Sequence, residues 1–161
     1  MAQTVRFVLD DAATAGLAEL RARPAARGIA VPSTPAAVTV AAATMIPAAA
    51  QEVLAAELRL LVLPSIWLAT LATVAGRPDE VVLAAVVDAE LLAVHAAVHD
   101  ALAGRVRGPV AAYLPGAWLP HCVLATNRPV EAFATLHPVV PVRARITDVI
   151  VENGTVVIDR P

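Results

Sequence analysis

The sequence predicts an α+β protein with a bilobal duplicated fold: two pseudo-symmetric lobes of antiparallel sheet, helices on the outside and a central groove. One order of elements, which is strand, helix, strand, helix and further strands, occurs over about residues 1–76 and again over about 79–161. A short strand of similar pattern lies inside each half, at 36–41 and 120–125. With 161 residues, the chain is expected to fold as one domain that buries most of its apolar surface. The two inner strands should then lie side by side across the groove.

The first half opens with residues 4–9, a run rich in β-branched and aromatic residues that predicts a strand. Asp10 or Asp11 is then suited to cap a helix over 12–23, because a carboxylate there accepts a hydrogen bond from the first helical turn. Pro24 marks the end of that helix.

The inner strand of the first half is predicted over 37–42. Pro47 suits the first turn of a second helix, over 48–57, because proline lacks the N–H that this turn leaves unpaired. Two apolar runs follow, 59–63 and 66–74, and we interpret both as strands.

The second half begins after a turn at 76–79, with a strand over 80–87. Asp88 is expected to cap a long helix over 89–103, which ends at Gly104. A loop over 105–120 then leads to the second inner strand.

The chain closes with a short helix over 129–136 and a hairpin of two strands. The strands are expected at 139–151 and 155–159, joined by a turn at Asn153-Gly154, which is the strongest two-residue hairpin signal.

Composition narrows the possible environments and partners. The formal net charge is −2 and the isoelectric point is near 6.0, which gives no electrostatic signature of strong nucleic-acid binding. Hydrophobic residues make up 58% of the chain, yet the longest uncharged runs, 28–51 and 60–76, are broken by proline or shorter than the ~20 residues of a membrane span. We therefore expect no membrane association.

The N-terminus and the cysteine content favour a cytoplasmic protein. Arg6 and Asp10 interrupt the one apolar stretch that could begin a signal peptide. Cys122 is the single cysteine, which excludes an internal disulfide framework and a cysteine-based zinc site.

The two inner strands carry the residues of greatest chemical interest. Residues two apart on a strand point to the same face, so His121 shares a face with Val123, and Ala37 shares one with Thr39. The stretches 120–125 and 36–41 resemble the paired His-x-Thr/Ser-hydrophobic motifs of the 2H phosphoesterase superfamily, in the group of 2′-5′ RNA ligases and RNA 2′,3′-cyclic phosphodiesterases. Each copy departs from the motif at one position: Ala37 replaces a histidine, and Val123 replaces a hydroxyl residue.

The resemblance implies both a fold and a reaction. In the family, one imidazole acts as general base and the other as general acid on a 2′,3′-cyclic phosphate or a 2′-5′ link, while the hydroxyls hold phosphoryl oxygens. Carried over by position, His121 is the remaining catalytic imidazole and Thr39 the remaining phosphate ligand. No metal or nucleotide cofactor is implied, and a 2′,3′-cyclic phosphate or RNA end is the implied partner.

Two classes of function stay open at this point. The first is a hydrolase of cyclic phosphodiesters whose degenerate site leaves weak activity or none, as in a pseudoenzyme. The second is a non-catalytic relative that binds a phosphate or nucleotide, or serves as a scaffold. Ala37 separates them, since an enzyme of this mechanism needs a second group that transfers protons.

Other residues near the second motif are candidates for substrate binding. Arg128 could meet a phosphate, and Tyr113 and Trp118 could stack on a base. The alternatives are a solvated loop charge for the arginine and core packing for the aromatic residues. Likewise His121 could be a hydrogen-bonded histidine of the core, and Thr39 an ordinary strand threonine.

We expect His95, His99 and Cys122 to have structural rather than catalytic roles. His95 and His99 have the i, i+4 spacing of zinc ligands, but no adjacent third ligand is evident, so we expect packing histidines. Cys122 points away from its neighbour His121 and is expected to be a small buried hydrophobe. His137 is a weak candidate to replace the missing imidazole.

Overall fold

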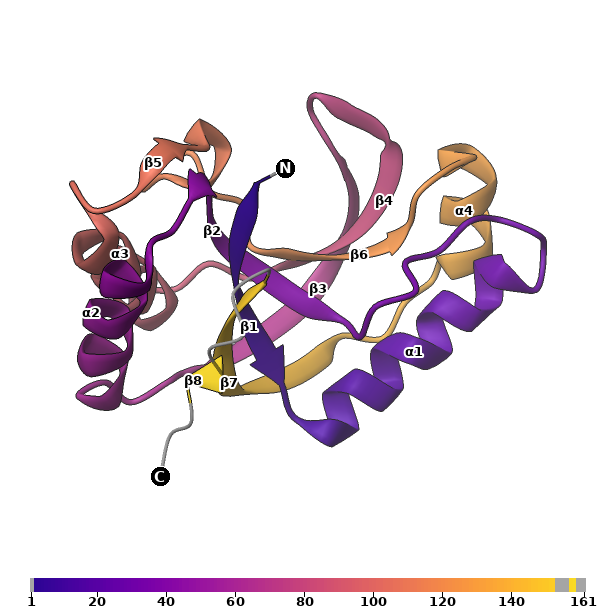
Figure 1. Cartoon of the computed structure of the whole chain (residues 1–161). Coiled ribbons are helices and arrows are strands. Elements are labelled where there is room, and N and C mark those ends of the chain that lie inside the picture. Colours follow the sequence, from indigo (N-terminus) through magenta and orange to yellow (C-terminus); the bar gives the residue numbers. More distant parts are fainter. Residues whose placement is uncertain (1, 153–156, 159–161) are drawn as a thin grey trace.

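The protein folds into one antiparallel β-sheet with α-helices packed against it (Figure 1). The computed structural model describes residues 2–152 and 157–158. The described strands are β1 (Gln3–Leu9), β2 (Ala37–Met45), β3 (Ser65–Val74), β4 (Arg77–Ala85), β5 (Arg107–Pro109), β6 (His121–Ala125), β7 (Val142–Glu152) and β8 (Val157–Ile158). The helices are α1 (Asp11–Ala25), α2 (Ala48–Arg59), α3 (Ala89–Leu102) and α4 (Pro129–Leu136), with a 3-10 turn at Ala111–Tyr113. The predicted α+β class is confirmed.

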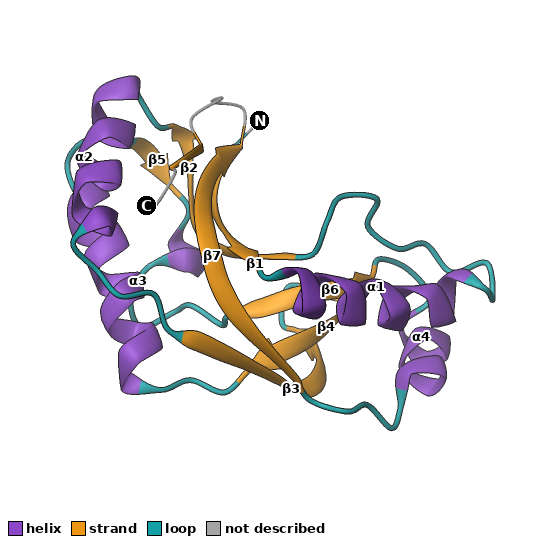
Figure 2. Ribbon diagram, turned by 90° about the horizontal axis from the view of Figure 1, so that it is seen from below, coloured by secondary structure: helices purple, strands orange, loops and turns teal. Residues whose placement is uncertain are grey.

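The strand order across the sheet is β5-β2-β1-β7-β3-β4-β6, with β8 paired to β7. Every pairing is antiparallel. Strand β7 is long and joins the two parts of the sheet, because its start pairs with β3 and its end with β1 (Figure 2).

The helices cover the sheet in two pairs, on opposite sides of the molecule (Figures 1 and 2). Helix α2 packs on α3, and α1 packs on α4. Each pair therefore takes one helix from each half of the sequence. The division into lobes at about residues 76 to 79 stays a prediction of the sequence pattern.

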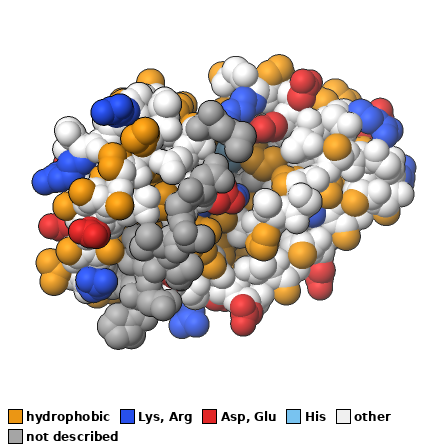
Figure 3. Space-filling model, in the orientation of Figure 1, with side chains coloured by type: hydrophobic (Ala, Val, Ile, Leu, Met, Phe, Trp, Pro, Cys, Tyr) orange, Lys and Arg blue, Asp and Glu red, His pale blue; other side chains and the backbone are white. Residues whose placement is uncertain are grey.

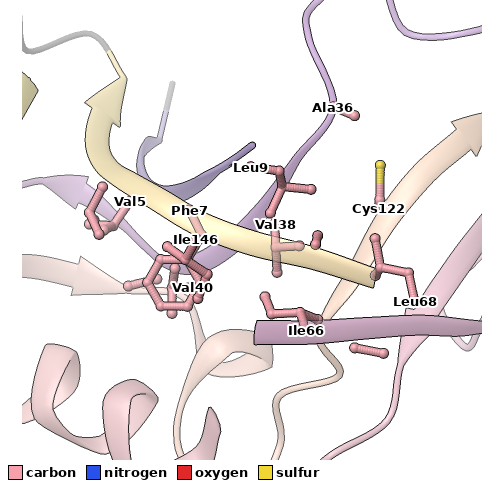
Figure 4. Close-up of a cluster of buried hydrophobic side chains, with 14 of the residues drawn as sticks. Val5, Phe7, Leu9, Ala36, Val38, Val40, Ile66, Leu68, Cys122 and Ile146 are labelled. Carbon is pink, nitrogen blue, oxygen red and sulfur yellow. The ribbon is translucent and has the colours of Figure 1, made fainter. Parts of the chain in front are cut away.

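One hydrophobic core joins both parts of the sheet (Figure 4). On β2, Val38 and Val40 are fully buried in it, and on β6, Cys122 and Leu124 are fully buried. Burial of each such valine or leucine contributes about 1.5–3 kcal/mol to folding. Because side chains alternate along a strand, this burial turns the residues between them to the opposite face.

The curvature of the sheet brings β2 and β6 close together, although four strands separate them in the sheet order. Twist accumulates from strand to strand in any sheet. Here the partner strand of each inner strand also has an irregular register, between Val5 and Arg6 on β1 and between Val81 and Val82 on β4. Such bulges increase local twist and bend the strand, which favours a closed groove.

Most predicted elements are present, and the differences have physical reasons. The strand predicted at 59–63 is wrong: Arg59 ends α2, and the amides of Leu60 and Leu61 continue its turns by bonding the carbonyls of Glu57 and Leu58. An apolar run without alternation does not distinguish a helix end from a strand.

Other boundaries also differ from the prediction. Strand β4 runs over Arg77–Ala85 rather than 80–87, so residues 77–79 of the predicted turn belong to the strand. The loop predicted over 105–120 contains β5 and the 3-10 turn. Helix α1 includes Pro24, which lies in its last turn. The pairing of β8 with β7 agrees with a terminal hairpin, whereas its predicted turn at Asn153-Gly154 lies outside the described residues.

The two aspartates expected as caps behave differently. Asp88 caps α3, because its Oδ1 accepts a hydrogen bond of 2.8 Å from the Leu91 amide. Asp10 stands at the N-cap position of α1, but its Oδ1 accepts from the Arg145 amide of β7, at 2.7 Å. Asp10 therefore ties the helix start to the sheet. Among the described helices, none is long and apolar enough to cross a membrane.

Candidate functional site

The four motif positions lie around one cavity. Ala37 and Thr39 from β2, and His121 and Val123 from β6, all line a groove of about 190 Å³. All four side chains are half-buried, between the fully buried residues of each strand. The alternation of each strand and the approach of β2 to β6 together produce this arrangement.

The rest of the groove wall is largely polar and comes from several elements. It consists of Arg6, Arg21, Pro32, Thr34, Arg77, Glu80, Tyr113 and Thr126. Of these, the sequence singled out only Tyr113. One signal could have found Arg6, since a charged residue inside the apolar strand 4–9 is unusual, and Arg6 pairs across the sheet with Thr39.

His121 is held by a backbone contact that fixes its protonation pattern. Its Nδ1 lies 2.7 Å from the carbonyl oxygen of Leu119. Because a carbonyl only accepts, Nδ1 donates, and in the neutral ring Nε2 is left with its lone pair. A neutral His121 is thus prepared to act as a proton acceptor through Nε2.

Arg21 brings a buried positive charge to the groove from α1. Its side chain is 9% exposed. Nε and Nη2 donate to the Val123 carbonyl at 3.0 and 2.9 Å, and Nη1 donates to the Thr34 carbonyl at 2.6 Å. Among the described residues, no carboxylate lies within ion-pair distance of this guanidinium. A buried charge held only by uncharged groups favours an anion nearby.

Arg77, Tyr113 and Glu80 form a second polar group at the groove. Arg77 Nη2 donates to the Tyr113 hydroxyl at 3.0 Å, and Arg77 Nη1 lies 3.6 Å from Glu80 Oε2. The hydrogen bond with Tyr113, and to a smaller extent Glu80, raises the pKa of Arg77. Both contacts therefore favour the charged form of Arg77.

Arg6 lines the groove from β1, paired with Glu152. Its Nη1 donates to Glu152 Oε1 at 2.7 Å, and Thr4 donates to the other oxygen of that carboxylate at 3.3 Å. The Nε of Arg6 is buried and has no hydrogen-bond partner among the described residues.

Two residues predicted to bind substrate lie away from the groove. Trp118 donates from Nε1 to the Thr39 carbonyl at 2.9 Å and stacks on His95, with ring centroids 4.0 Å apart. It therefore supports β2 from the core side. Arg128 pairs with Glu131 in a different hollow, of about 280 Å³, next to α4.

The remaining histidines make contacts of a structural kind. His95 Nε2 donates to the Tyr113 carbonyl at 2.8 Å, and His99 Nε2 contacts the Val40 carbonyl at 3.0 Å. Burial lowers the pKa of His95. His137 stacks on Phe133, outside the groove. No three His, Cys, Asp or Glu side chains of the described residues gather as a metal site would require.

Cys122 is buried and lies beneath the groove rather than in it. Burial raises the pKa of its thiol, and the charge of Arg21, whose Nη2 is 3.9 Å from the sulfur, opposes that rise only in part. A thiol with a raised pKa and no exposure is a poor nucleophile.

A larger hollow of about 430 Å³ adjoins the groove, between α1 and residues 31–36. It shares Arg21, Pro32 and Thr34 with the groove, and most of its remaining wall is alanine and proline. The smaller cavity is the candidate site because it alone combines the motif positions with charged side chains. On the face in Figure 3, arginines lie singly or beside acidic residues rather than as one basic patch.

No protein-family model matches the sequence, and no curated protein matches it either. Among solved structures, the chain is similar to Usb1 of Kluyveromyces marxianus, at 12% sequence identity over 97% of this chain and 95% of that one, with a TM-score of 0.49. A likeness at this level carries no argument about function, which has to come from the groove.

Proposed function

We propose that the protein is a 2H phosphoesterase-like protein whose groove binds the phosphate of a nucleotide or RNA end, with Thr39 and, when Nε2 carries a proton, His121 as ligands. One observation carries the proposal: both pairs of motif positions line a single cavity that also contains three arginines. Guanidinium groups are the preferred protein ligands of phosphate, because their planar donors match its oxygens.

The chemistry of such a groove can be followed atom by atom. To open a 2′,3′-cyclic phosphate, a water oxygen forms a bond to phosphorus, and the bond from phosphorus to one ribose oxygen breaks. One proton leaves the water, and one proton must reach the departing ribose oxygen. The free Nε2 of His121 suits the first transfer, and Thr39 and the arginines suit the phosphoryl oxygens.

The second transfer has no imidazole in this chain. Ala37 contributes only a methyl group at the position that the resemblance assigns to the other histidine. A positioned acid or base contributes about 10²–10⁴-fold to a rate, so hydrolysis should be weak or absent while phosphate binding persists.

The test is a comparison of the wild type with His121→Ala, using adenosine 2′,3′-cyclic monophosphate and an oligonucleotide with a cyclic phosphate end. We expect slow hydrolysis or none in the wild type, none in the variant, and weaker binding of inorganic phosphate to the variant. Phosphate binding that His121→Ala and Thr39→Val both leave unchanged would reject the proposal.

A further inference from the structure

The hollow between α1 and residues 31–36 adjoins the groove and is more than twice its volume. The segment that joins α1 to β2 runs back along the helix, and the hollow opens between the two (Figure 1). Arg21, Pro32 and Thr34 belong to the walls of both cavities. Because the two cavities share these residues, one ligand can extend from the groove into the hollow.

The sizes of the two cavities suit different parts of a nucleotide. The groove, at about 190 Å³, is smaller than the ~300–1,000 Å³ of most small-molecule sites, so it has room for a phosphate and little more. The hollow, at about 430 Å³, lies within that range. A nucleotide whose phosphate is in the groove must place its nucleoside outside it, and the hollow is large enough to receive it.

The helix side of the hollow presents methyl groups. Ala18, Ala22 and Ala25 line the hollow, and all three are exposed. Their i, i+4 and i+7 positions place them on one face of α1. Because these positions carry nothing larger than a methyl group, a flat ring system can lie against them. Covering exposed methyl groups with an apolar ring is favourable by about 25 cal/mol per Å² of buried area.

The loop side of the hollow is uncharged and partly polar. Pro32 and Pro35 fix the backbone φ angle and so stiffen this wall. Between them, the exposed Ser33 and Thr34 contribute hydroxyl groups. Ser33 makes no hydrogen bond to any described residue, so its hydroxyl is available to a ligand. A nucleoside has the same two characters, since its base has apolar faces and its ribose carries hydroxyls.

The wall of the hollow lacks the side chains that distinguish one base from another. Proteins tell bases apart by directional hydrogen bonds to the base edges, for which carboxylate, amide and free guanidinium groups are suited. The residues that line the hollow include no Asp, Glu, Asn or Gln. The guanidinium of Arg21 is engaged by the carbonyls of Val123 and Thr34. Apolar burial remains, and it is non-directional.

We infer that the hollow holds the nucleoside of a bound nucleotide, with the base against the alanines of α1 and without selection among the four bases. The inference rests on the proposed function, because it takes the phosphate in the groove as given, and it adds the part of the site that holds the rest of the ligand. Arg21 belongs to both walls, so its positive charge holds the phosphate where the ligand passes from the groove into the hollow.

Calorimetric titration of the wild type with six probes tests the class of ligand. They are the 3′-monophosphates of adenosine, guanosine, cytidine and uridine, together with n-hexyl phosphate and inorganic phosphate. All six offer a phosphate to the groove, and they differ in what the hollow receives. We expect the four nucleotides to bind within about fivefold of one another, and each at least about tenfold more tightly than hexyl phosphate and inorganic phosphate.

Two substitutions that fill the hollow test where the nucleoside lies. Ala22→Leu and Ala18→Leu each place a larger side chain on the helix wall, and leucine keeps a high helix propensity. Ala15→Leu is the matched control, because Ala15 is also exposed on α1 but does not line the hollow. The readout is the ratio of the affinities for adenosine 3′-monophosphate and inorganic phosphate. We expect each filling variant to lower this ratio at least about fivefold and the control to leave it unchanged.

Tyr113 provides a competing position for the base, since it lines the groove. If Tyr113→Leu lowers the ratio and neither filling variant does, the base lies against Tyr113 and the inference is wrong. Three further results would overturn it and leave the phosphate site standing: nucleotides that bind no more tightly than inorganic phosphate, hexyl phosphate that binds as tightly as the nucleotides, or a preference of more than about tenfold for one base. If none of the six probes binds, the proposed function itself fails.

Discussion

The two inner strands differ in what supports them from behind. On β2, the Thr39 carbonyl accepts from Trp118, and the Val40 carbonyl contacts His99. On β6, the Val123 carbonyl accepts two bonds from Arg21. In both cases the support comes from the other half of the sequence. The supporting side chains are an indole and an imidazole on the β2 side, and the guanidinium of Arg21 on the β6 side.

This support makes the backbone geometry of the groove independent of the side chains at positions 37 and 123. The supports hold backbone carbonyls, which every residue has, so replacing a side chain at position 37 or 123 leaves them in place. The backbone geometry of the groove thus does not depend on the side chains that would carry out its chemistry. The following changes test that independence, from the largest expected effect to the smallest.

Introducing the two residues that the proposed function lacks should have the largest effect. In Ala37→His with Val123→Thr, the groove should gain hydrolysis of adenosine 2′,3′-cyclic monophosphate by about 10²-fold or more over the wild type, because the proposed site then has a second positioned proton-transfer group. The rate is followed by chromatography of the nucleoside monophosphate product. Val123→Thr alone is the control and should gain little. A folded double variant with no gain would contradict the assignment of the motif positions.

Removing the charged support of β6 should come next. Arg21→Met leaves the carbonyls of Val123 and Thr34 without their donor, which should lower the free energy of unfolding by about 2–3 kcal/mol. Urea denaturation measures the loss. The exposed Arg23 lies on the same helix, and Arg23→Met should stay within about 0.5 kcal/mol of the wild type. Equal effects of the two changes would show that Arg21 does not support β6.

Removing the Trp118 support of β2 should lower the free energy of unfolding less than removing Arg21. Trp118→Phe keeps an aromatic ring against His95 but loses the hydrogen bond to Thr39, at a cost of about 0.5–1.5 kcal/mol in unfolding free energy. The same denaturation series measures it. A loss larger than that of Arg21→Met would reverse the proposed ranking of the two supports.

The smallest effect is a pH dependence confined to the β2 side. Burial lowers the pKa of His95, which stacks on Trp118, so the unfolded chain binds a proton below about pH 6.5 where the folded chain does not. Above that pH, His95 is neutral in both the folded and the unfolded chain and does not change the free energy of unfolding. As pH falls below it, stability should decrease by at most ~1.4 kcal/mol per pH unit.

Denaturation between pH 7 and pH 5 measures this loss, with His95→Gln as the control for the carboxylates that also titrate. The stability of the wild type should fall more steeply than that of the variant. If the stability of the wild type and of His95→Gln decreased equally with falling pH, His95 would not be the source of a pH dependence on the β2 side.

The amino-acid sequence alone determined the local elements and the faces of the inner strands. Alternation placed Val38 and Cys122 in the core, and the Asp88 cap and the helix at Pro129–Leu136 follow from short-range rules about hydrogen bonding and proline. These features depend on residues a few positions apart.

Tertiary structure alone decided the composition of the groove wall. Arg21 is separated from Val123 by 102 positions, and Arg77 from Tyr113 by 36. The contacts depend on strand order, on the bulges in β1 and β4 and on the curvature of the sheet, which are set by packing of the whole core. A periodic pattern records which face a residue occupies. It does not record which distant residue occupies the facing position, because that is fixed only when the sheet closes.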